Sequence, residues 1–226
     1  MTKLGAGDSA VAIGDNALAD SSDAVALGHL SKATRGSAAA VGFGATAGGV
    51  NSLAAGVSAQ AGGTGSLAVG AGAKAIIDGA LAIGPNAQAG APGLTDLAPG
   101  VSAIAIGFNT IATHSVAVGS AALASNGGAA YGDYAKATGP LSTALGPNAS
   151  TTAANAVAIG SGAVANEEGI VSVGAPGNER RITNIAAGTA ASDAATVGQL
   201  TDLRAQLEEV RRECGLPART ARAGGE

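Results

Sequence analysis

The chain has 226 residues, a length compatible with a single domain, and its residues are unusually small. Hydrophobic residues make up 46% of it, but only 2% are aromatic, with no Trp, while Gly alone contributes 37 residues. So few large side chains cannot fill an ordinary globular core, and the composition favours a fibrous or solenoid architecture. The formal net charge of −4 argues against nucleic acid or an anionic membrane surface as a partner.

Charge is distributed unevenly along the chain. Residues 1–178 hold 5 basic and 9 acidic side chains, whereas residues 179–226 hold 7 of each, which predicts two regions with a boundary near Asn178. No apolar run approaches the roughly 20 residues of a membrane-spanning helix, so we expect no membrane contact by this chain. No signal peptide is recognisable, and if the protein is secreted we expect this chain to be part of a longer one.

An internal repeat dominates the chain up to that boundary. Each copy is a short aliphatic run ending on a glycine, and the twelve glycines are spaced by 14 residues five times, then by 23, 12 and 13, then by 14 three times. Apolar residues stand one and three positions before the glycine, as Val11 and Ile13 do, and small residues follow it, as Ala17 and Ala19 do. The repeat glycines are Gly14, Gly28, Gly42, Gly56, Gly70, Gly84, Gly107, Gly119, Gly132, Gly146, Gly160 and Gly174.

Alternation with period two is typical of β-strands, so each copy predicts a β-branched strand, a glycine turn, a small-residue strand and a second turn. Stacking the copies gives a parallel β-solenoid, in which identical positions lie above one another at ~4.8 Å. We expect the valine and isoleucine pairs to point into the coil and the alanine between them to face outward. That outward alanine row would be flat and apolar, and it is our candidate for burial against another chain.

One stretch interrupts the repeat. Residues 89–100, with the sequence AGAPGLTDLAPG, lengthen the interval between Gly84 and Gly107 and carry Pro92 and Pro99 as turn residues. We interpret the stretch as an excursion from the solenoid, either a tolerated surface insertion or a dedicated binding loop.

A heptad pattern follows the repeats. Five residues spaced by 3, 4, 3 and 4 form the a/d seam of a coiled coil, and charged or polar residues separate them. Gly215 and Pro217 then end the helix. Two heptads are too short to hold a coiled coil, so an upstream contact must bring the chains together. The seam residues are Leu200, Leu203, Leu207, Val210 and Cys214.

The repeated phrases SAVAIG-DNALA and NAVAIG-SGAVA resemble the head repeats of trimeric autotransporter adhesins, the YadA-like surface proteins of bacteria. The segment RITNIAAGTAASDAATVGQL, residues 181–200, is similar to the neck motif of that family. Head repeats, neck and heptads follow one another in the family's order over residues of about 9–214. The matching neck residues are Arg181, Ile182, Asn184, Gly188, Asp193, Ala194, Gln199 and Leu200.

The resemblance implies an all-β head of left-handed parallel β-rolls with 14-residue repeats, a neck, and a short α-helical coiled coil, assembled as a homotrimer. We divide the chain into a head at residues 1–178, a neck at 179–199, the start of the stalk at 200–214 and a tail at 215–226 that we expect to be disordered. The resemblance also implies display on the bacterial cell surface, anchored in the outer membrane by a C-terminal β-barrel outside this chain. The 23-residue interval, the weak eighth to tenth copies and the tail LPARTARAGGE depart from the family pattern.

The sequence offers no constellation of catalytic, cofactor-binding or metal-ligating residues. His29 and His114 occupy different repeat positions and are interpreted as solvated side chains rather than metal ligands. Glu167 and Glu168 stand in a predicted turn and are interpreted as solvated too. Cys214 stands at an a position, where a packed small side chain is favoured over an interchain disulfide.

Two classes of function fit this sequence. The first is an adhesin head that attaches to host extracellular matrix or to a cell-surface receptor by many weak contacts, with a structural spacer as its alternative. The second is an enzyme on a β-solenoid, which would need charged or histidine side chains clustered on one face. Residues 1–178 hold only 14 scattered charges, so we favour the adhesin, with its ligand unidentified.

Overall fold

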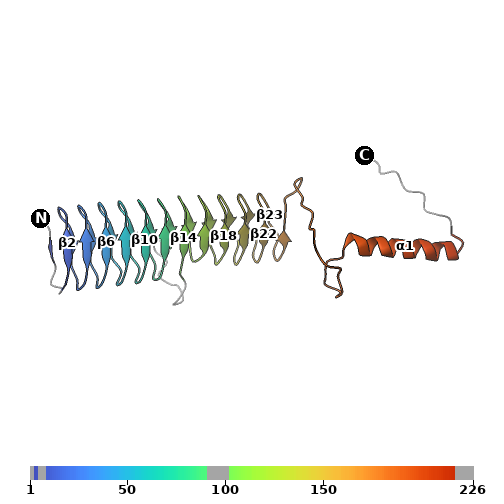
Figure 1. Ribbon diagram of the computed structural model, residues 1–226, viewed down its shortest axis with the longest axis horizontal. Coiled ribbons are helices and arrows are strands. Elements are labelled where there is room, and N and C mark those ends of the chain that lie inside the picture. Colours follow the sequence, from blue (N-terminus) through green and yellow to red (C-terminus); the bar gives the residue numbers. More distant parts are fainter. Residues whose placement is uncertain (1–2, 5–8, 91–101, 217–226) are drawn as a thin grey trace. The chain divides into compact units, whose positions relative to one another are not determined.

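A computed structural model describes residues 3–4, 9–90 and 102–216. The chain divides into two compact units, Met1–Glu179 and Arg180–Glu226. The first unit is a rod of stacked coils, and the second contains a loop segment and one helix (Figure 1). Most of the predicted excursion at 89–100 and of the tail at 215–226 lies outside the described residues.

The rod consists of two twelve-stranded parallel sheets whose strands alternate along the chain. One sheet holds the three-residue runs before the repeat glycines: β2 (Val11–Ile13), β4 (Val25–Leu27), β6 (Ala39–Val41), β8 (Leu53–Ala55), β10 (Leu67–Val69), β12 (Leu81–Ile83), β14 (Ile104–Ile106), β16 (Val116–Val118), β18 (Ala129–Tyr131), β20 (Thr143–Leu145), β22 (Val157–Ile159) and β24 (Val171–Ser172). The other holds the two-residue runs after them: β1 (Lys3–Leu4), β3 (Leu18–Ala19), β5 (Lys32–Ala33), β7 (Thr46–Ala47), β9 (Gln60–Ala61), β11 (Lys74–Ala75), β13 (Gln88–Ala89), β15 (Ile111–Ala112), β17 (Leu123–Ala124), β19 (Lys136–Ala137), β21 (Ser150–Thr151) and β23 (Val164–Ala165). The predicted parallel β-solenoid is thereby confirmed.

Equivalent repeat positions pair with one another along both sheets. Ala68 of β10, for example, pairs with Ala54 of β8 on one side and with Ala82 of β12 on the other. The turns are bonded between coils in the same way, since the N–H of Gly42 donates to the carbonyl of Leu27 at 2.8 Å. Each coil is therefore held by its neighbours through a continuous backbone ladder.

The irregular copies keep this register because their length differs only in the second turn of the coil. Across the excursion, Leu81 of β12 still pairs with Ile104 of β14. The copy with a 12-residue interval has three residues between β15 and β16, residues 113–115, where a regular coil has five. The first turn, which begins at each repeat glycine, keeps four residues in every complete copy from Gly14 to Gly160.

The orientation that we expected for the strand side chains is wrong. The alanine in the middle of each three-residue strand points into the coil, and Ala26, Ala68 and Ala158 have no exposed surface. The flanking aliphatic residues point outward and are half-buried or exposed, Ile13 at 63%. Every buried hydrophobic residue in the described part of the chain is an alanine. The predicted outward alanine row does not exist, and its place is taken by valine, isoleucine and leucine.

The narrowness of the coil explains this reversal. Three-residue and two-residue strands joined by tight turns leave an interior with room only for methyl and hydroxyl groups. The largest fully buried side chains in the described residues are threonine and serine, and Thr151 donates from Oγ1 to Oγ of Ser142 at 2.8 Å. Because neighbouring residues of a strand face opposite sides, an alanine inside obliges its larger neighbours to face out.

The repeat glycines form a column in which backbones of successive coils touch. Eleven of the twelve have positive φ between 109° and 138°, Gly174 being the exception. A Cβ built on Gly56 would stand 2.5 Å from the carbonyl oxygen of Gly70, and Gly70 meets Gly84 in the same way. Any side chain in this column would therefore push neighbouring coils apart.

The second unit contains the helix α1 (Val197–Glu213) after a segment without regular structure. Thr196 is its N-cap and forms a capping box with Gln199, while Cys214 is its C-cap. No residue of α1 is buried. The helix thus begins three residues before the predicted seam and keeps its whole apolar side uncovered.

Candidate adhesive and assembly surfaces

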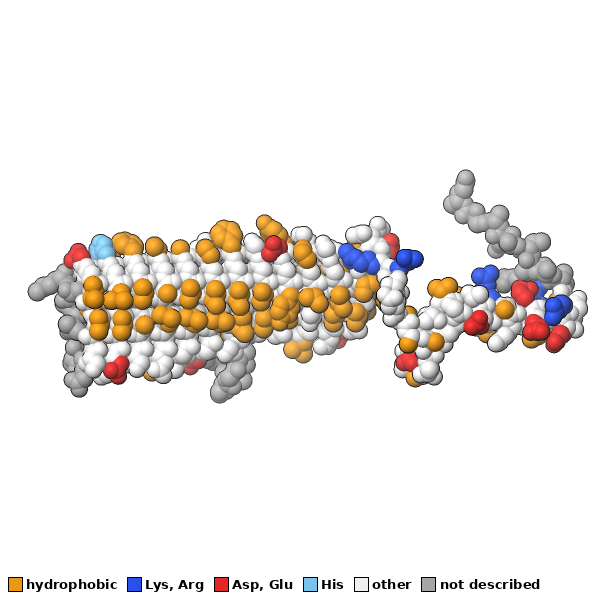
Figure 2. Space-filling view, viewed as in Figure 1, with side chains coloured by type: hydrophobic (Ala, Val, Ile, Leu, Met, Phe, Trp, Pro, Cys, Tyr) orange, Lys and Arg blue, Asp and Glu red, His pale blue; other side chains and the backbone are white. Residues whose placement is uncertain are grey.

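The broadest apolar surface of the rod is the outer side of the β2–β24 sheet. Two rows of orange side chains run along the rod in Figure 2, and they come from the residues one and three positions before each repeat glycine. Neighbouring side chains in a row belong to paired residues, as Val69 and Ile83 do. The exposed large members are Val11, Ile13, Val41, Leu53, Tyr131, Leu145, Ile159 and Val171. A continuous apolar surface of this kind marks a site of contact with another protein.

The outer side of the β1–β23 sheet is mixed in character. Its residues four positions after the repeat glycines include three lysines, of which Lys32 and Lys136 are exposed. Polar members of this row are Lys32, Thr46, Gln60, Lys74, Gln88, Lys136 and Ser150, and apolar members are Leu18, Ile111, Leu123 and Val164. The two sheets therefore differ in the surfaces that they offer, because only the β2–β24 sheet is apolar along most of its length.

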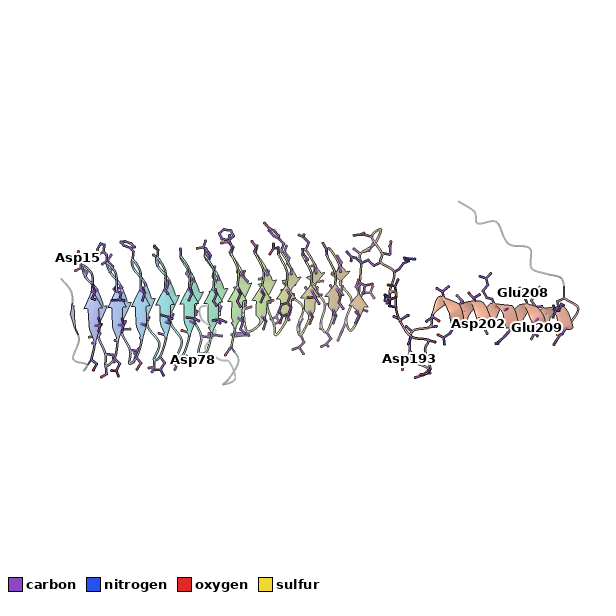
Figure 3. The ribbon with its side chains drawn as sticks, in the orientation of Figure 1. Asp15, Asp78, Asp193, Asp202, Glu208 and Glu209 are labelled. Carbon is purple, nitrogen blue, oxygen red and sulfur yellow. The ribbon has the colours of Figure 1, made fainter. Side chains whose placement is uncertain are left out.

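A third surface lies along the edge where the first turns project. We define the first-turn ridge as the residues one and two positions after each repeat glycine; Figure 3 shows one of them, Asp15, on the edge opposite Asp78. His29 and Phe43 belong to it and meet edge to face, with ring centroids 5.2 Å apart. The exposed large hydrophobic residues of the ridge are Leu30, Phe43, Val57, Phe108 and Tyr134.

In the second unit, Gln199 ties the loop segment to the start of α1. Its Oε1 accepts from the backbone N–H groups of Gly188 and Thr196, both at 3.0 Å, and its Nε2 donates to the carbonyl of Gly188 at 2.8 Å. A Cβ on Gly188 would stand 2.9 Å from the carbonyl oxygen of Ala194. One glutamine side chain thus closes an eleven-residue loop on the N-terminus of the helix.

Asp193 organises the turn inside that loop. Its carboxylate accepts from the N–H of Ala190 at 2.9 Å and from the N–H of Thr189 at 3.0 Å. These hydrogen bonds, that of Ala190 first, lower the pKa of Asp193 below its ordinary value. Of the other predicted neck residues, Arg181, Ile182 and Asn184 are exposed, and Asn184 has a positive φ of 61°.

Four of the five predicted seam residues follow one side of α1, as their spacing requires, and the fifth, Cys214, is its C-cap. Leu200, Leu203, Leu207 and Val210 are each more than half exposed, and Cys214 is an exposed free thiol. Elsewhere on the helix, Arg211 lies 3.8 Å from Glu208 and Arg212 lies 3.7 Å from Glu209. Four large aliphatic side chains in one line on an uncovered helix are a surface for another helix.

The histidines and the acidic pair do not form a polar site. His29 lies on the ridge with Nε2 3.8 Å from a carboxylate oxygen of Asp15, whereas His114 is a half-buried residue in the shortened second turn. Glu167 and Glu168 are exposed turn residues. Within residues 3–4, 9–90 and 102–216, no three His, Cys, Asp or Glu side chains are grouped to hold a metal ion. In the same residues no helix is long and apolar enough to cross a membrane.

These surfaces define a fibrous, repeat-built binding protein, and comparison with known proteins places it in a family. The family described as "YadA head domain repeat (2 copies)" matches residues 6–31, 19–45, 47–73, 98–114 and 137–163. The family described as "Coiled stalk of trimeric autotransporter adhesin" matches residues 181–211. A search of curated proteins found no match.

Among solved structures, the crystal structure of the collagen-binding domain of the Yersinia adhesin YadA is similar to this chain. The two share 27% sequence identity with a TM-score of 0.52, and the match covers 87% of this chain and 98% of that one. The chain belongs to the YadA-like trimeric autotransporter adhesins. Family and fold together indicate a non-enzymatic role.

Sequence reasoning identified neither the two apolar rows on the outer side of the β2–β24 sheet, which we call the aliphatic face, nor the first-turn ridge as a surface. A signal for the first was present, because Tyr131 occupies a flanking strand position that a narrow core could not hold. A signal for the second was the position after the repeat glycine, where residues as different as Phe43, Ala71 and Asp133 occur. Variation in size at a repeat position indicates that the position faces solvent or a partner.

Proposed function

We propose that this chain is the head and the beginning of the stalk of a trimeric bacterial surface adhesin, displayed outside the cell, that attaches to host extracellular matrix. Collagen is the first candidate ligand, because the similar Yersinia structure is a collagen-binding domain. The observation that supports attachment is the rod itself, whose surfaces are long, regular and nearly uncharged. A ligand that is itself a long fibre can make many weak contacts with such a rod at once.

Trimer formation is the second part of this proposal. Three rods would cover their aliphatic faces against one another, and three α1 helices would cover the line from Leu200 to Val210. The neck residues Arg181, Ile182, Asn184, Gly188, Asp193 and Gln199 would then set the geometry with which the three chains enter the stalk. On this proposal the head comprises residues 1–178, the neck residues 179–199 and the stalk residues 200–214.

The test uses the purified 226-residue chain. Light scattering should give about three times the chain mass of 21.0 kDa. In a surface-binding assay the trimer should bind immobilised native collagen and bind heat-denatured collagen more weakly. A stable monomer would contradict the proposed trimer. Equal binding to collagen and to a blank surface would contradict collagen as the ligand.

A spacer that only projects another binding domain is a weaker candidate than an adhesive head. A spacer needs the length and stiffness of the rod, but it does not need large exposed apolar groups on the first-turn ridge. Phe43 and Phe108 are such groups, each about half exposed, at 50% and 53%.

A further inference from the structure

We propose that the β1–β23 sheet carries a second binding surface, for a linear acidic polysaccharide of the host matrix whose carboxylates are widely spaced along a neutral chain. The surface is the row of outward residues four positions after each repeat glycine, which we call the lysine row. It lies on the sheet that does not carry the aliphatic face. The inference goes beyond the proposed attachment to collagen and does not depend on it.

Charge in the rod is sorted by position in the coil. All four lysines of the chain stand at one place in the strands of the β1–β23 sheet, because Lys3 pairs with Leu18 and Leu18 pairs with Lys32. None of the described strands contains Asp or Glu, and the acidic residues described in the coils lie in the turns. Asp15 and Asp78, labelled on opposite edges in Figure 3, are examples. Positive charge therefore belongs to one sheet face, and negative charge belongs to the edges.

The ammonium groups of the lysine row are available to a ligand. Lys32 and Lys136 are exposed, and Lys74 is half-buried. Among the residues that the structure describes, no carboxylate forms an ion pair with any of these three. A lysine ammonium is a compact point charge with three donors, and a carboxylate oxygen is a suitable acceptor for it.

The spacing of the lysines sets the charge density of the ligand. Lys32 and Lys74 are three coils apart and Lys74 and Lys136 are four, or about 14 and 19 Å at ~4.8 Å per coil. Both separations exceed the Debye length of about 8 Å at physiological ionic strength, so the three charges act singly. Duplex DNA, with one charge per ~1.7 Å, would leave most of its phosphates without a lysine and close to the acidic turns. A chain with few, separated carboxylates matches the row better.

Neutral hydrogen-bonding groups separate the lysines over one continuous stretch. Thr46 and Gln60 occupy the two coils after Lys32, and Lys74 and Gln88 occupy the next two. Gln60 is exposed, while Thr46 and Gln88 are half-buried. Amide and hydroxyl groups both donate and accept hydrogen bonds, as the hydroxyl groups of a sugar chain do. Five consecutive coils thus offer a polar strip about 19 Å long to an extended polysaccharide.

Assembly leaves this surface uncovered. The aliphatic face belongs to the other sheet, so three rods joined through it keep their lysine rows on the outside. Each exposed lysine contributes little alone, because exposed ion pairs are weak. Three rows on one particle can still hold a long polysaccharide through effective concentration.

The experiment compares two triple variants of the 226-residue chain. The lysine variant carries Lys32→Gln, Lys74→Gln and Lys136→Gln, which remove the described charges of the row. Gln is compatible with the fold at these sites, because Gln60 and Gln88 occupy the same repeat position. Light scattering and circular dichroism accompany each binding measurement.

The matched control removes three positive charges from elsewhere in the chain. It carries Arg35→Gln in a second turn of the rod, with Arg204→Gln and Arg212→Gln in α1. The immobilised probes are hyaluronan, a linear polysaccharide with a carboxylate on every second sugar, and neutral dextran. Heparin and duplex DNA serve as densely charged chains, and native collagen is measured separately.

We expect the wild-type chain and the arginine variant to bind hyaluronan equally and to bind neither dextran nor DNA. The lysine variant should keep its mass, its β-sheet signal and its collagen binding, but bind hyaluronan at least about tenfold more weakly. Absence of wild-type binding to hyaluronan would overturn the inference. Equal losses in the two variants would also overturn it, because net charge alone would then explain binding.

The remaining outcomes separate this surface from the others. Tighter wild-type binding to heparin or DNA than to hyaluronan would overturn the assigned charge spacing. Loss of the trimer in the lysine variant would make the row a subunit contact, and loss of its collagen binding would make the row part of the collagen surface; either result overturns the inference. Absence of collagen binding by the wild-type chain contradicts the proposed ligand, whereas its binding to hyaluronan would still support the lysine row.

Discussion

The rod and the helix α1 differ in whether their apolar residues are buried within one chain. In the rod each coil closes on an alanine core of its own and stacks on its neighbours, so the strand ladder and the core are both complete within one chain. In α1 no residue is buried, and the four large aliphatic residues of its seam are more than half exposed. The comparison shows that the rod has the contacts of an independently folded unit, whereas the apolar side of the helix has no contacts within its own chain to cover it.

The difference also separates two uses of large apolar residues. Inside the rod they are excluded, and those on its outer faces are left for contacts between molecules. In α1 they form the only apolar surface, so the same residues must supply both helix stability and assembly. Changes in the rod core should therefore alter folding, and changes in α1 should alter association.

The largest effect should come from the glycine column. Gly56→Ala places a Cβ 2.5 Å from the carbonyl oxygen of Gly70 at a φ of +138°, so coils must separate or the backbone must change. We expect a loss of about 3 kcal/mol or more in the free energy of unfolding. Thermal melting followed by the β-sheet circular dichroism signal measures it.

The matched control is Gly65→Ala, which lies in the second turn of the same copy. Gly65 has a φ of +64° and nothing within 4 Å of the added Cβ, so only the modest cost of a left-handed alanine remains. We expect about 1 kcal/mol. Equal melting temperatures for the two variants would show that the column tolerates separation of the coils.

The next effect concerns the narrow core. Ala82→Leu inserts a large side chain where no space is available, and overpacking of this kind costs roughly 1 to 3 kcal/mol. Leu81→Ala, at the adjacent outward position, should leave the melting of the rod nearly unchanged and lower the fraction of trimer in light scattering instead. If Leu81→Ala destabilised the rod more than Ala82→Leu does and left the mass in light scattering unchanged, the alanine core would be contradicted.

The sequence predicted the solenoid because its evidence is local and repeated. Period-two alternation and a 14-residue spacing fix which residues form strands and which coil positions pair. Alternation says that Leu81 and Ala82 face opposite sides, but it does not say which side is the core. That depends on the distance between the two sheets, which is a property of the closed coil and not of any strand.

The second unit shows a similar division. The heptad spacing identified the side of α1 that carries Leu200, Leu203 and Leu207, because three-and-four spacing translates directly into a helix face. The resemblance to a neck motif pointed to Gly188 and Gln199. Their mutual hydrogen bonds span eleven residues of irregular backbone, and no periodic pattern encodes such a contact.

A third prediction tests whether α1 depends on its partners. Leu203→Asp puts a charge in the apolar line of the helix and should weaken association by about 2 kcal/mol, the value of burying one leucine. In this variant the helical circular dichroism signal at 222 nm should fall on dilution, while the β-sheet signal of the rod stays constant. Ala205→Asp, which adds the same charge on the side of the helix away from that line, is the control and should change neither signal. A concentration-independent helix in the Leu203→Asp variant would contradict the dependence.

The smallest effect should come from Asp193, whose two backbone hydrogen bonds lie in an exposed turn. Because hydrogen bonds from Ala190 and Thr189 lower its pKa below the ordinary value of 3.8, its contribution to the folded turn is complete above that value and is lost as pH falls through the lower folded-state pKa. In an NMR titration from pH 6 to pH 2, the amide signals of Thr189 and Ala190 should therefore keep their positions until the pH is below about 3.8 and then shift together. Asp193→Asn retains a side-chain carbonyl as acceptor but cannot titrate, so its two amide signals should stay in place throughout. Signals that shift with a midpoint above 3.8 in the wild-type chain would show that the turn does not stabilise the carboxylate, and the hydrogen bonds of Asp193 could not then be what orders the loop before α1.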